Sequence, residues 1–501
     1  MSRPFAVPAI AVFAGLAAGA CAVVRPVKLV PPPPPAAFVV DPAVARSAAP
    51  GATDAPGSTE RATQSAVWWA AFSDLSLDGA IQEALRNNYF IRDVRTLIYE
   101  NGLDPLTPRG WLWPLQIGIP PTTPAGVQHL VVGSSPFDSV DDTGKKVRSP
   151  ATQQSFNSAN VDITASYQLD VWGNLDAQRR VADDLVEQQR QNTESASQNL
   201  AEQVTQLWFD ILVQRALKQQ TEGEVKYNQE LFDLVKARFE QHLTPRLVVL
   251  QQEQQLLSIR SQVPLIAARI ATLNSQLTLL LGRTPNPNDE LVPADRKLPD
   301  LPPEPRLGTP ADLVENTSEM RLAKLRVTEI ENRVNQNLSS WLPTIDLVAS
   351  TGVITFGSSA ETFRESFAGV RLTWPIFDGG RRMIEAKQLE LTLKRRKWQY
   401  DLAIKTAVGR VQDALLQEKS QAESLRSLRG QIELGRRVLD EARRLFEQGQ
   451  SDYLSVLNAL SSLAALERNG LQAQRLLLTY RVQLYRALGG TWSYDVTKLP
   501  N

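Results

Sequence analysis

Residues that commonly carry chemistry are sparse in this chain. It has two histidines, His129 and His242, and a single cysteine, Cys21. Neither histidine belongs to an HExxH motif or to a cysteine–histidine cluster, so the spacing predicts no metal site. The chain has no GxSxG nucleophile turn, and Gly144-Lys145 lacks the upstream glycine of a phosphate-binding loop. We therefore expect no enzymatic activity, no cofactor and no metal.

Cys21 is the one residue for which the sequence predicts a covalent modification. Arg3 precedes an apolar run from Phe5 to Ala20, which closes in small residues directly before Cys21. This order is typical of an export signal over residues 1–20, and the residues before Cys21 resemble the lipobox of bacterial lipoproteins. Acylation of Cys21 would add about 0.8 kcal/mol of membrane anchoring per buried methylene. An uncleaved membrane anchor is the alternative, because the apolar run continues to Val24.

The segment after the cysteine predicts a tether to the outer membrane. Ala22 is not the aspartate that resembles an inner-membrane retention signal, so an outer-membrane destination is favoured. Residues 21–65 contain a run of five prolines and are rich in Ala, Ser and Thr, which predicts an extended linker. Lys and Arg number 54, as do Asp and Glu, so no basic excess suggests a nucleic-acid partner.

The rest of the chain contains an internal repeat. An offset of 207 residues places Gly173 on Gly380, and it places Gly282 on Gly489 without a gap. The Phe-Glu-Gln run at 239–241 falls on the same three residues at 446–448. Because residues typical of turns and termini match in place, we expect two copies of one unit. The copies cover residues 66–282 and 307–490, with a proline-rich connector at 283–306 between them and a tail at 491–501.

Each copy is predicted to end in a long helical hairpin. Residues 174–241 contain no proline, and apolar residues in both copies recur at the three- and four-residue spacing of coiled coils. A helix of that length would span about 100 Å, more than a compact globule needs. Breaks at 242–245 and 449–452 divide the hairpins, which we expect over 174–282 and 380–490. Pro264 is expected to kink the first return helix.

A pair of strands is predicted ahead of each hairpin. Apolar and polar residues alternate over 161–171 and again over 370–376, with partners expected at 113–119 and 345–349. The strand pairs therefore occupy about 112–171 and 342–377, and residues 120–154 are expected to form the loop between the first two strands. One-sided strands of about ten residues fit a transmembrane β-barrel, although a half-buried soluble sheet alternates in the same way. Because even small barrels need about eight strands, other copies of the chain must complete it.

Motifs spanning residues 66–492 make the chain resemble the outer-membrane factors of the TolC/OprM superfamily, and specifically the NodT-like lipoproteins. In chain order they are Trp68-Trp69, Phe72-Ser73-Asp74, Leu77, Ala84, Asn87-Asn88, Tyr167 to Gly173, Leu279 to Gly282, Pro375 to Arg381, Leu484 to Gly490 and Trp492. The resemblance implies a mainly α fold with membrane β structure. It would be a homotrimer whose 12-stranded outer-membrane β-barrel continues into a periplasmic α-helical barrel of coiled-coil hairpins.

The resemblance also implies a function and partners. Such proteins are passive exit ducts of tripartite efflux systems, and they dock on a periplasmic adaptor (a membrane fusion protein) and an inner-membrane pump. We expect a pump of the RND type, and contact with outer-membrane lipid. The alternative is a periplasmic coiled-coil scaffold or adaptor lipoprotein without a pore, which would need the long helices but not four one-sided strands.

The two hairpin turns would form the periplasmic tip and gate of the tunnel. Relatives commonly carry aspartates there, and the positions that match them are Ser455 and Asn458 in the second copy and Val248 in the first. Phe446 matches a tyrosine that some relatives use in a closing latch, and His242 replaces the usual glycine.

We hypothesise that this duct lacks an acidic cation-binding constriction and closes by the packing of Phe446, Leu454 and Leu457. A narrow ring of carboxylates would favour cations and bind divalent ions, whereas neutral Ser455 and Asn458 should not. The alternative is that these residues are only variants in helix packing.

Overall fold

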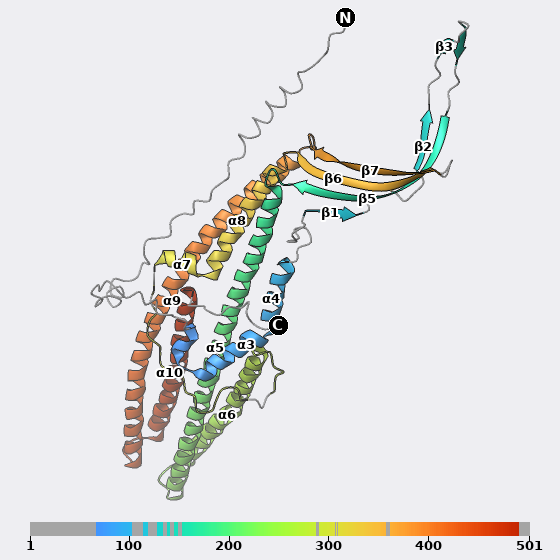
Figure 1. The fold of residues 1–501 in the computed structure, drawn as a ribbon. Coiled ribbons are helices and arrows are strands. Elements are labelled where there is room, and N and C mark those ends of the chain that lie inside the picture. The colour runs from blue at the N-terminus through green and yellow to red at the C-terminus, as the bar shows by residue number, and fades with distance from the viewer. Residues whose placement is uncertain are drawn as a thin grey trace. The chain divides into compact units, whose positions relative to one another are not determined.

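The computed structural model describes residues 67–102, 114–118, 128–133, 138–140, 145–148, 153–286, 290–305, 307, 309–356 and 361–489. The predicted signal peptide, Cys21, the whole linker at 21–65 and the tail at 491–501 lie outside these residues. The chain forms two compact units (Figure 1). Of the described residues, the first unit comprises those within 101–185 and 328–395, and the second comprises those within 67–100, 186–327 and 396–489.

Four long helices form two hairpins of equal dimensions. α5 (Asn174–Glu240) and α9 (Arg381–Glu447) each have 67 residues, and α6 (Arg246–Leu280) and α10 (Tyr453–Ala487) each have 35. The offset of 207 residues carries both ends of α5 onto the ends of α9, and both ends of α6 onto those of α10. The hairpins thus lie where they were predicted. Pro264 lies inside α6, which continues on both sides of it.

The first unit contains an antiparallel sheet in the order β1-β5-β6-β7, with β2 also paired to β5 (Figure 1). Its strands are β1 (Gln116–Gly118), β2 (Gln128–Gly133), β5 (Gln153–Leu169), β6 (Thr344–Phe356) and β7 (Glu361–Thr373). The expected pairings are present, because Ile117 lies opposite Ala165 and Leu347 opposite Val370.

Two details of the strand prediction were wrong. β7 ends at Thr373, ahead of the predicted boundary, because Pro375 cannot donate to a ladder. The predicted loop at 120–154 contains β2 and a small hairpin of β3 (Asp138–Val140) and β4 (Lys146–Arg148). Three consecutive apolar residues at 130–132 break the alternation that would have marked β2 as a one-sided strand.

One face of the sheet is exposed and mainly apolar, with Arg364 opposite Val353 at the end near the β6–β7 connection. Residues opposite one another in the ladder share a face, and alternate residues of each strand face opposite sides. The register therefore gathers exposed apolar side chains on one face, namely Ile117, Ile163, Tyr167, Leu347, Val353, Val370 and Leu372. The other face carries Asp162, Thr164, Gln168, Asp346, Glu365 and Arg371, together with Phe363 and Phe367.

The second unit has its main core where short N-terminal elements pack on the long helices. The 3₁₀ helix η1 (Trp68–Phe72) supplies Trp69 and Phe72, and α3 (Leu75–Asn87) supplies Leu77 and Ile81; these residues lie buried in one core with Trp208 and Phe209 of α5. Asp74 caps α3 by accepting from the Ser76 N–H, and it also accepts from Trp208 Nε1 at 3.1 Å. The first motif of the family resemblance is therefore built into this core.

The described residues form three further helices. α4 (Tyr89–Gly102) follows α3, and α7 (Pro310–Asn316) and α8 (Ser318–Ser339) follow the connector. The described parts of the connector at 283–306 contain no helix or strand.

Candidate functional site

The turns that end α5 and α9 have the same geometry. In the first, the Leu243 N–H donates to the Arg238 carbonyl at 2.9 Å, and in the second the Gln450 N–H donates to the Leu445 carbonyl at 2.9 Å. These bonds close a left-handed C-terminal cap, which needs a positive φ at the residue before the donor. His242 has φ 57° and Gly449 has φ 74°. His242 therefore adopts the conformation that its counterpart reaches as a glycine.

The helices that leave the two turns begin differently. At the start of α10, the Asp452 carboxylate accepts from the Ser455 N–H at 3.0 Å and from the Ser455 hydroxyl at 2.5 Å. These bonds lower the pKa of the Asp452 carboxyl, which keeps it ionised at neutral pH. α6 follows Pro245 and has no side-chain cap bond. Ser455 thus completes an N-cap, and an ionised carboxylate lies three residues before it.

A small core joins the two hairpins at this end of the second unit. Phe446 is buried against Tyr453, with ring centroids 6.3 Å apart. The Arg238 guanidinium lies 4.8 Å from the centroid of the Phe446 ring and donates to the Phe446 carbonyl at 3.2 Å. Val248 and Leu457 are partly buried against the same core.

The other predicted tip residues are exposed. Leu454 has 54% of its surface exposed, and Ser455, Asn458 and His242 are also exposed. The three apolar residues predicted to close the gate are therefore not equivalent. Phe446 holds two hairpins of one chain together, Leu457 is half-buried, and Leu454 is the one that presents an open apolar surface.

Sequence reasoning missed a buried polar cluster in the same region. The Gln252 amide of α6 donates to the Asn228 carbonyl at 2.8 Å and to Asn228 Oδ1 at 3.2 Å, and the Tyr453 hydroxyl of α10 donates to Gln252 Oε1. All three residues are buried, and burial raises the pKa of Tyr453 to about 12. A signal was present, because Gln252 stands at coiled-coil spacing from Leu256 and Ile259.

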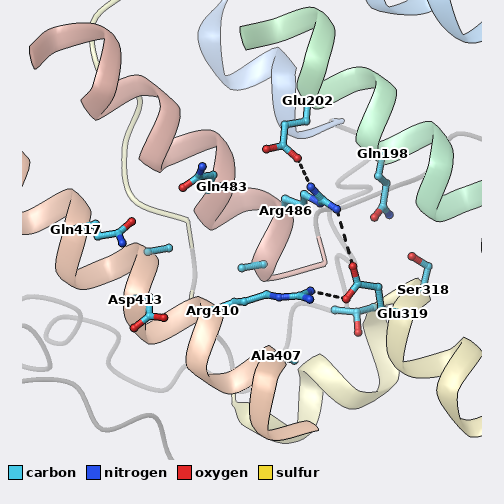
Figure 2. A pocket seen from close by; sticks show the side chains of 13 residues that line it. Gln198, Glu202, Ser318, Glu319, Ala407, Arg410, Asp413, Gln417, Gln483 and Arg486 are labelled. Atoms are coloured by element: carbon cyan, nitrogen blue, oxygen red, sulfur yellow. Dashed lines mark hydrogen bonds and ion pairs between the residues drawn. The ribbon is translucent and has the colours of Figure 1, made fainter. Parts of the chain in front are cut away.

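A polar cavity of about 420 Å³ lies elsewhere in the second unit, among α5, α8, α9 and α10. Figure 2 shows Arg486 reaching toward Glu202 and Glu319, and Arg410 reaching toward Glu319. These charges pair with one another and tie the four helices together. Among the residues that the structure describes, no group of three or more His, Cys, Asp or Glu side chains could hold a metal ion.

Comparisons with known proteins agree on one family. The model of the outer membrane efflux protein family matches residues 140–283 and 309–490. The pyoverdine export outer membrane protein OpmQ of Pseudomonas aeruginosa is 25% identical over 438 residues, which cover 85% of this chain and 88% of OpmQ.

Two further likenesses concern sequence and fold, respectively. Nodulation protein T of Rhizobium leguminosarum bv. trifolii is 23% identical over 253 residues, which cover 49% of this chain and 54% of that protein. The structure of the outer-membrane channel OprN superposes with a TM-score of 0.70 at 20% identity, covering 92% of this chain and 99% of OprN. The chain belongs to the outer membrane efflux protein family, and it is an outer-membrane exit duct of the TolC, OprM and NodT type.

Proposed function

We propose that three copies of this chain form the passive outer-membrane exit duct of a tripartite efflux system. The observation that carries the proposal is the sheet of the first unit, with its exposed apolar face and two open edges. β1 and β2 lie along one edge and β7 along the other, so a copy on each side would continue the ladder. Because β1 and β2 both pair with β5 along the same edge, each sheet is four strands wide. Three such sheets would supply a 12-stranded barrel with the apolar face toward lipid, as family resemblance leads us to expect.

Two of the long helices, α6 and α9, also expose apolar surface. Exposed large apolar residues number five on α6 and eight on α9, against one each on α5 and α10. α6 is also the one helix of the described chain long and apolar enough to cross a membrane. We attribute this apolar surface to contacts between copies, because α5 and α10 already pack against each other. The Gln220 amide of α5 donates to the Ala464 carbonyl of α10 at 3.3 Å.

The repeat predicts which surfaces meet. Since α5 packs on α10 within the chain, the 207-residue offset predicts that α9 packs on α6 of the next copy. Tyr227 and Leu231 of α5 belong to the core shared with the second hairpin, and Leu231 is buried there. Their counterparts on α9, Leu434 and Val438, are 56% and 57% exposed. A large apolar side chain thus stands at the same place, but the described residues of its own chain leave more than half of it exposed.

Assembly can be tested with a matched pair of variants. We expect detergent-extracted protein to have the mass of three chains, and Val438→Glu to leave helical single chains because it charges the surface between copies. Leu231→Glu should instead destabilise the chain itself, because it charges a buried core. Native mass spectrometry and circular dichroism separate these outcomes. A Val438→Glu protein that stays fully trimeric would contradict the proposed α6–α9 contact.

The partners proposed for the duct are a periplasmic adaptor at the hairpin tip and an inner-membrane pump of the RND type, with Cys21 acylated in the outer membrane. The runner-up is a pore-less periplasmic scaffold. A scaffold in the aqueous periplasm does not need a sheet with an exposed apolar face. The duct is therefore favoured.

We further propose that the tip closes by apolar packing between copies, led by Leu454, without carboxylates at positions 455 and 458. Asp452 complicates this gate, because its exposed ionised carboxylate is held by the Ser455 hydroxyl. Asn458→Asp should add three carboxylates to the constriction and introduce cation selectivity and divalent block. Single-channel recordings decide it, with Asp452→Asn as the matched control. If the native channel already shows the block and Asp452→Asn removes it, Asp452 supplies the acidic constriction and the hypothesis is wrong.

A further inference from the structure

One ion pair between the two repeats lies on α8. Arg321 Nη2 lies 2.6 Å from Glu194 Oε1 of α5, and Arg321 Nε donates to Gln191 Oε1 at 2.8 Å. All of these groups are partly buried. The pair therefore attaches a helix of the second repeat to the long helix of the first.

α4 is the first-repeat counterpart of α8. An offset of 229 residues places the first residue of α4, Tyr89, on the first residue of α8, Ser318. It also places Ile91, which is buried, on Met320, which is buried too. The preceding residues, Asn88 and Thr317, each accept at the backbone carbonyl from the N–H four residues later, at 3.1 Å. The offset exceeds 207 because the first repeat has the longer loop between its strands.

The offsets of 207 and 229 residues assign to each residue of one repeat an equivalent residue in the other repeat. Each contact between the two repeats of one chain therefore has an equivalent contact between neighbouring copies. Arg321 of α8 corresponds to Arg92 of α4, and Glu194 of α5 corresponds to Asp401 of α9. Both counterparts keep their charge. Neither Arg92 nor Asp401 has an ion-pair partner among the residues that the structure describes. Arg92 is exposed, and its Nε donates to the Arg86 carbonyl at 3.3 Å.

The counterparts of three other ion pairs do not keep their charges. All three join α5 to second-repeat helices, and none of their counterparts is charged. The pairs are Arg486–Glu202, Arg475–Asp210 and Arg468–Glu224, with counterparts Leu279–Gly409, Ala268–Gln417 and Ser261–Gln431. The equivalent surface between copies has therefore lost these three charge pairs, whereas the counterparts of Arg321 and Glu194 keep both charges.

We propose that Arg92 of one copy forms an ion pair with Asp401 of the next copy, which places α4 of each chain on α9 of its neighbour. This inference rests on the proposed assembly of several copies into a duct. It explains why α4 exposes Tyr89, Phe90 and Tyr99, and why α9 exposes Trp398, three residues before Asp401 in the helix. The ion pair sets the register of the contact, and the apolar residues around it supply contact area.

A charge exchange tests the pair. Arg92→Asp places two carboxylates together at each contact, and we expect on the order of a ten-fold rise in the protein concentration needed for half-assembly. Asp401→Arg should have a similar effect, and the double exchange should restore assembly. The matched control is Arg321→Asp with Glu194→Arg, which should change the unfolding of the chain without separating copies. Single variants that assemble like the native protein, or a double exchange that fails to restore assembly, would overturn the pairing.

Cross-linking distinguishes a wrong pair from a wrong assembly. A chain with Cys21→Ser, Arg92→Cys and Asp401→Cys, treated with a short bis-maleimide, should give covalent dimers and trimers, while each single variant on the Cys21→Ser background gives monomers. Monomers alone from a double variant whose native form is trimeric would reject the pair and leave the duct intact. A native protein that never assembles would instead reject the proposed function.

Discussion

At the scale of single residues, His242 and Gly449 occupy equivalent turns with the same left-handed backbone. A Cβ in that conformation approaches the neighbouring carbonyl oxygen and costs about 1 kcal/mol. The sequence showed that a histidine had replaced the glycine, but not whether the turn survived. The positive φ of His242 and the matching hydrogen bonds show that it did.

The backbone strain gives a paired prediction. Gly449→His should lower the free energy of unfolding by about 1 kcal/mol, because it introduces the same unfavourable Cβ contact. His242→Gly should act in the opposite direction, by less, since glycine also gains freedom in the unfolded chain. Urea unfolding followed by circular dichroism measures both. Unchanged stability in Gly449→His would show that this turn tolerates a side chain without strain.

The buried Tyr453 predicts a pH dependence. Its pKa in the folded chain is about 12, whereas an unfolded tyrosine titrates near pH 10. The folded state holds the proton more tightly, so this stability is complete below pH 10 and is lost as the pH rises from 10 to 12. The loss should approach about 1.4 kcal/mol per pH unit inside that window.

The variant Tyr453→Phe isolates this contribution. Its stability should fall less steeply than that of the native chain between pH 10 and 12, measured as the difference between two unfolding series. At neutral pH it should cost about 1–3 kcal/mol, because Gln252 Oε1 loses its donor while it remains buried. Parallel curves for the two proteins above pH 10 would show that Tyr453 is not the group concerned.

At the scale of elements, the helices and strands were largely readable from the sequence. Hydrophobic periodicity and turn residues at matched places located four long helices within a few residues of their observed ends. The buried contacts between helices were harder to predict from the sequence. The Asn228–Gln252–Tyr453 cluster depends on which two hairpins meet and at what height, and neither is encoded within one helix.

The faces of the sheet give a prediction for the strands. Leu347 lies on the apolar face and Asp346, the preceding residue, on the other. Leu347→Arg should therefore cost roughly 2–4 kcal/mol if that face meets the middle of a bilayer, whereas Asp346→Arg should cost little. Folding into lipid vesicles, followed by heat-modifiable migration, compares them. Equal effects of the two variants would contradict the assignment of faces.

At the scale of the whole molecule, the two repeats are alike in backbone and different in surface charge. Within one chain the first and second repeats are joined by ion pairs such as Arg468–Glu224 and Arg486–Glu202. The surfaces predicted to join successive copies carry uncharged residues in their place, namely Leu279, Gly409, Ser261 and Gln431. This difference suggests that the charged contacts fix the hairpins within a chain, and that apolar burial then assembles the copies.

The sequence predicted this organisation only in part. The repeat itself required no structure, because it follows from matched residues. The structure was needed to show that α6 and α9 carry most of the exposed apolar residues of the long helices. Periodicity alone cannot tell an exposed leucine from a buried one. The tip residues could be predicted in part. Their positions followed from the repeat, but the burial of Phe446 and the exposure of Leu454 did not.

The central claim is that assembled copies of this chain form a duct, and bilayer conductance tests it most directly. Full-length protein would be extracted in detergent, separated by native mass, and added fraction by fraction to planar bilayers. We predict discrete conductance steps from the fraction at about three times the chain mass of 55.5 kDa, and none from single chains. A homogeneous trimer that conducts nothing, including after removal of the tip residues 239–249 and 446–456, would contradict the account.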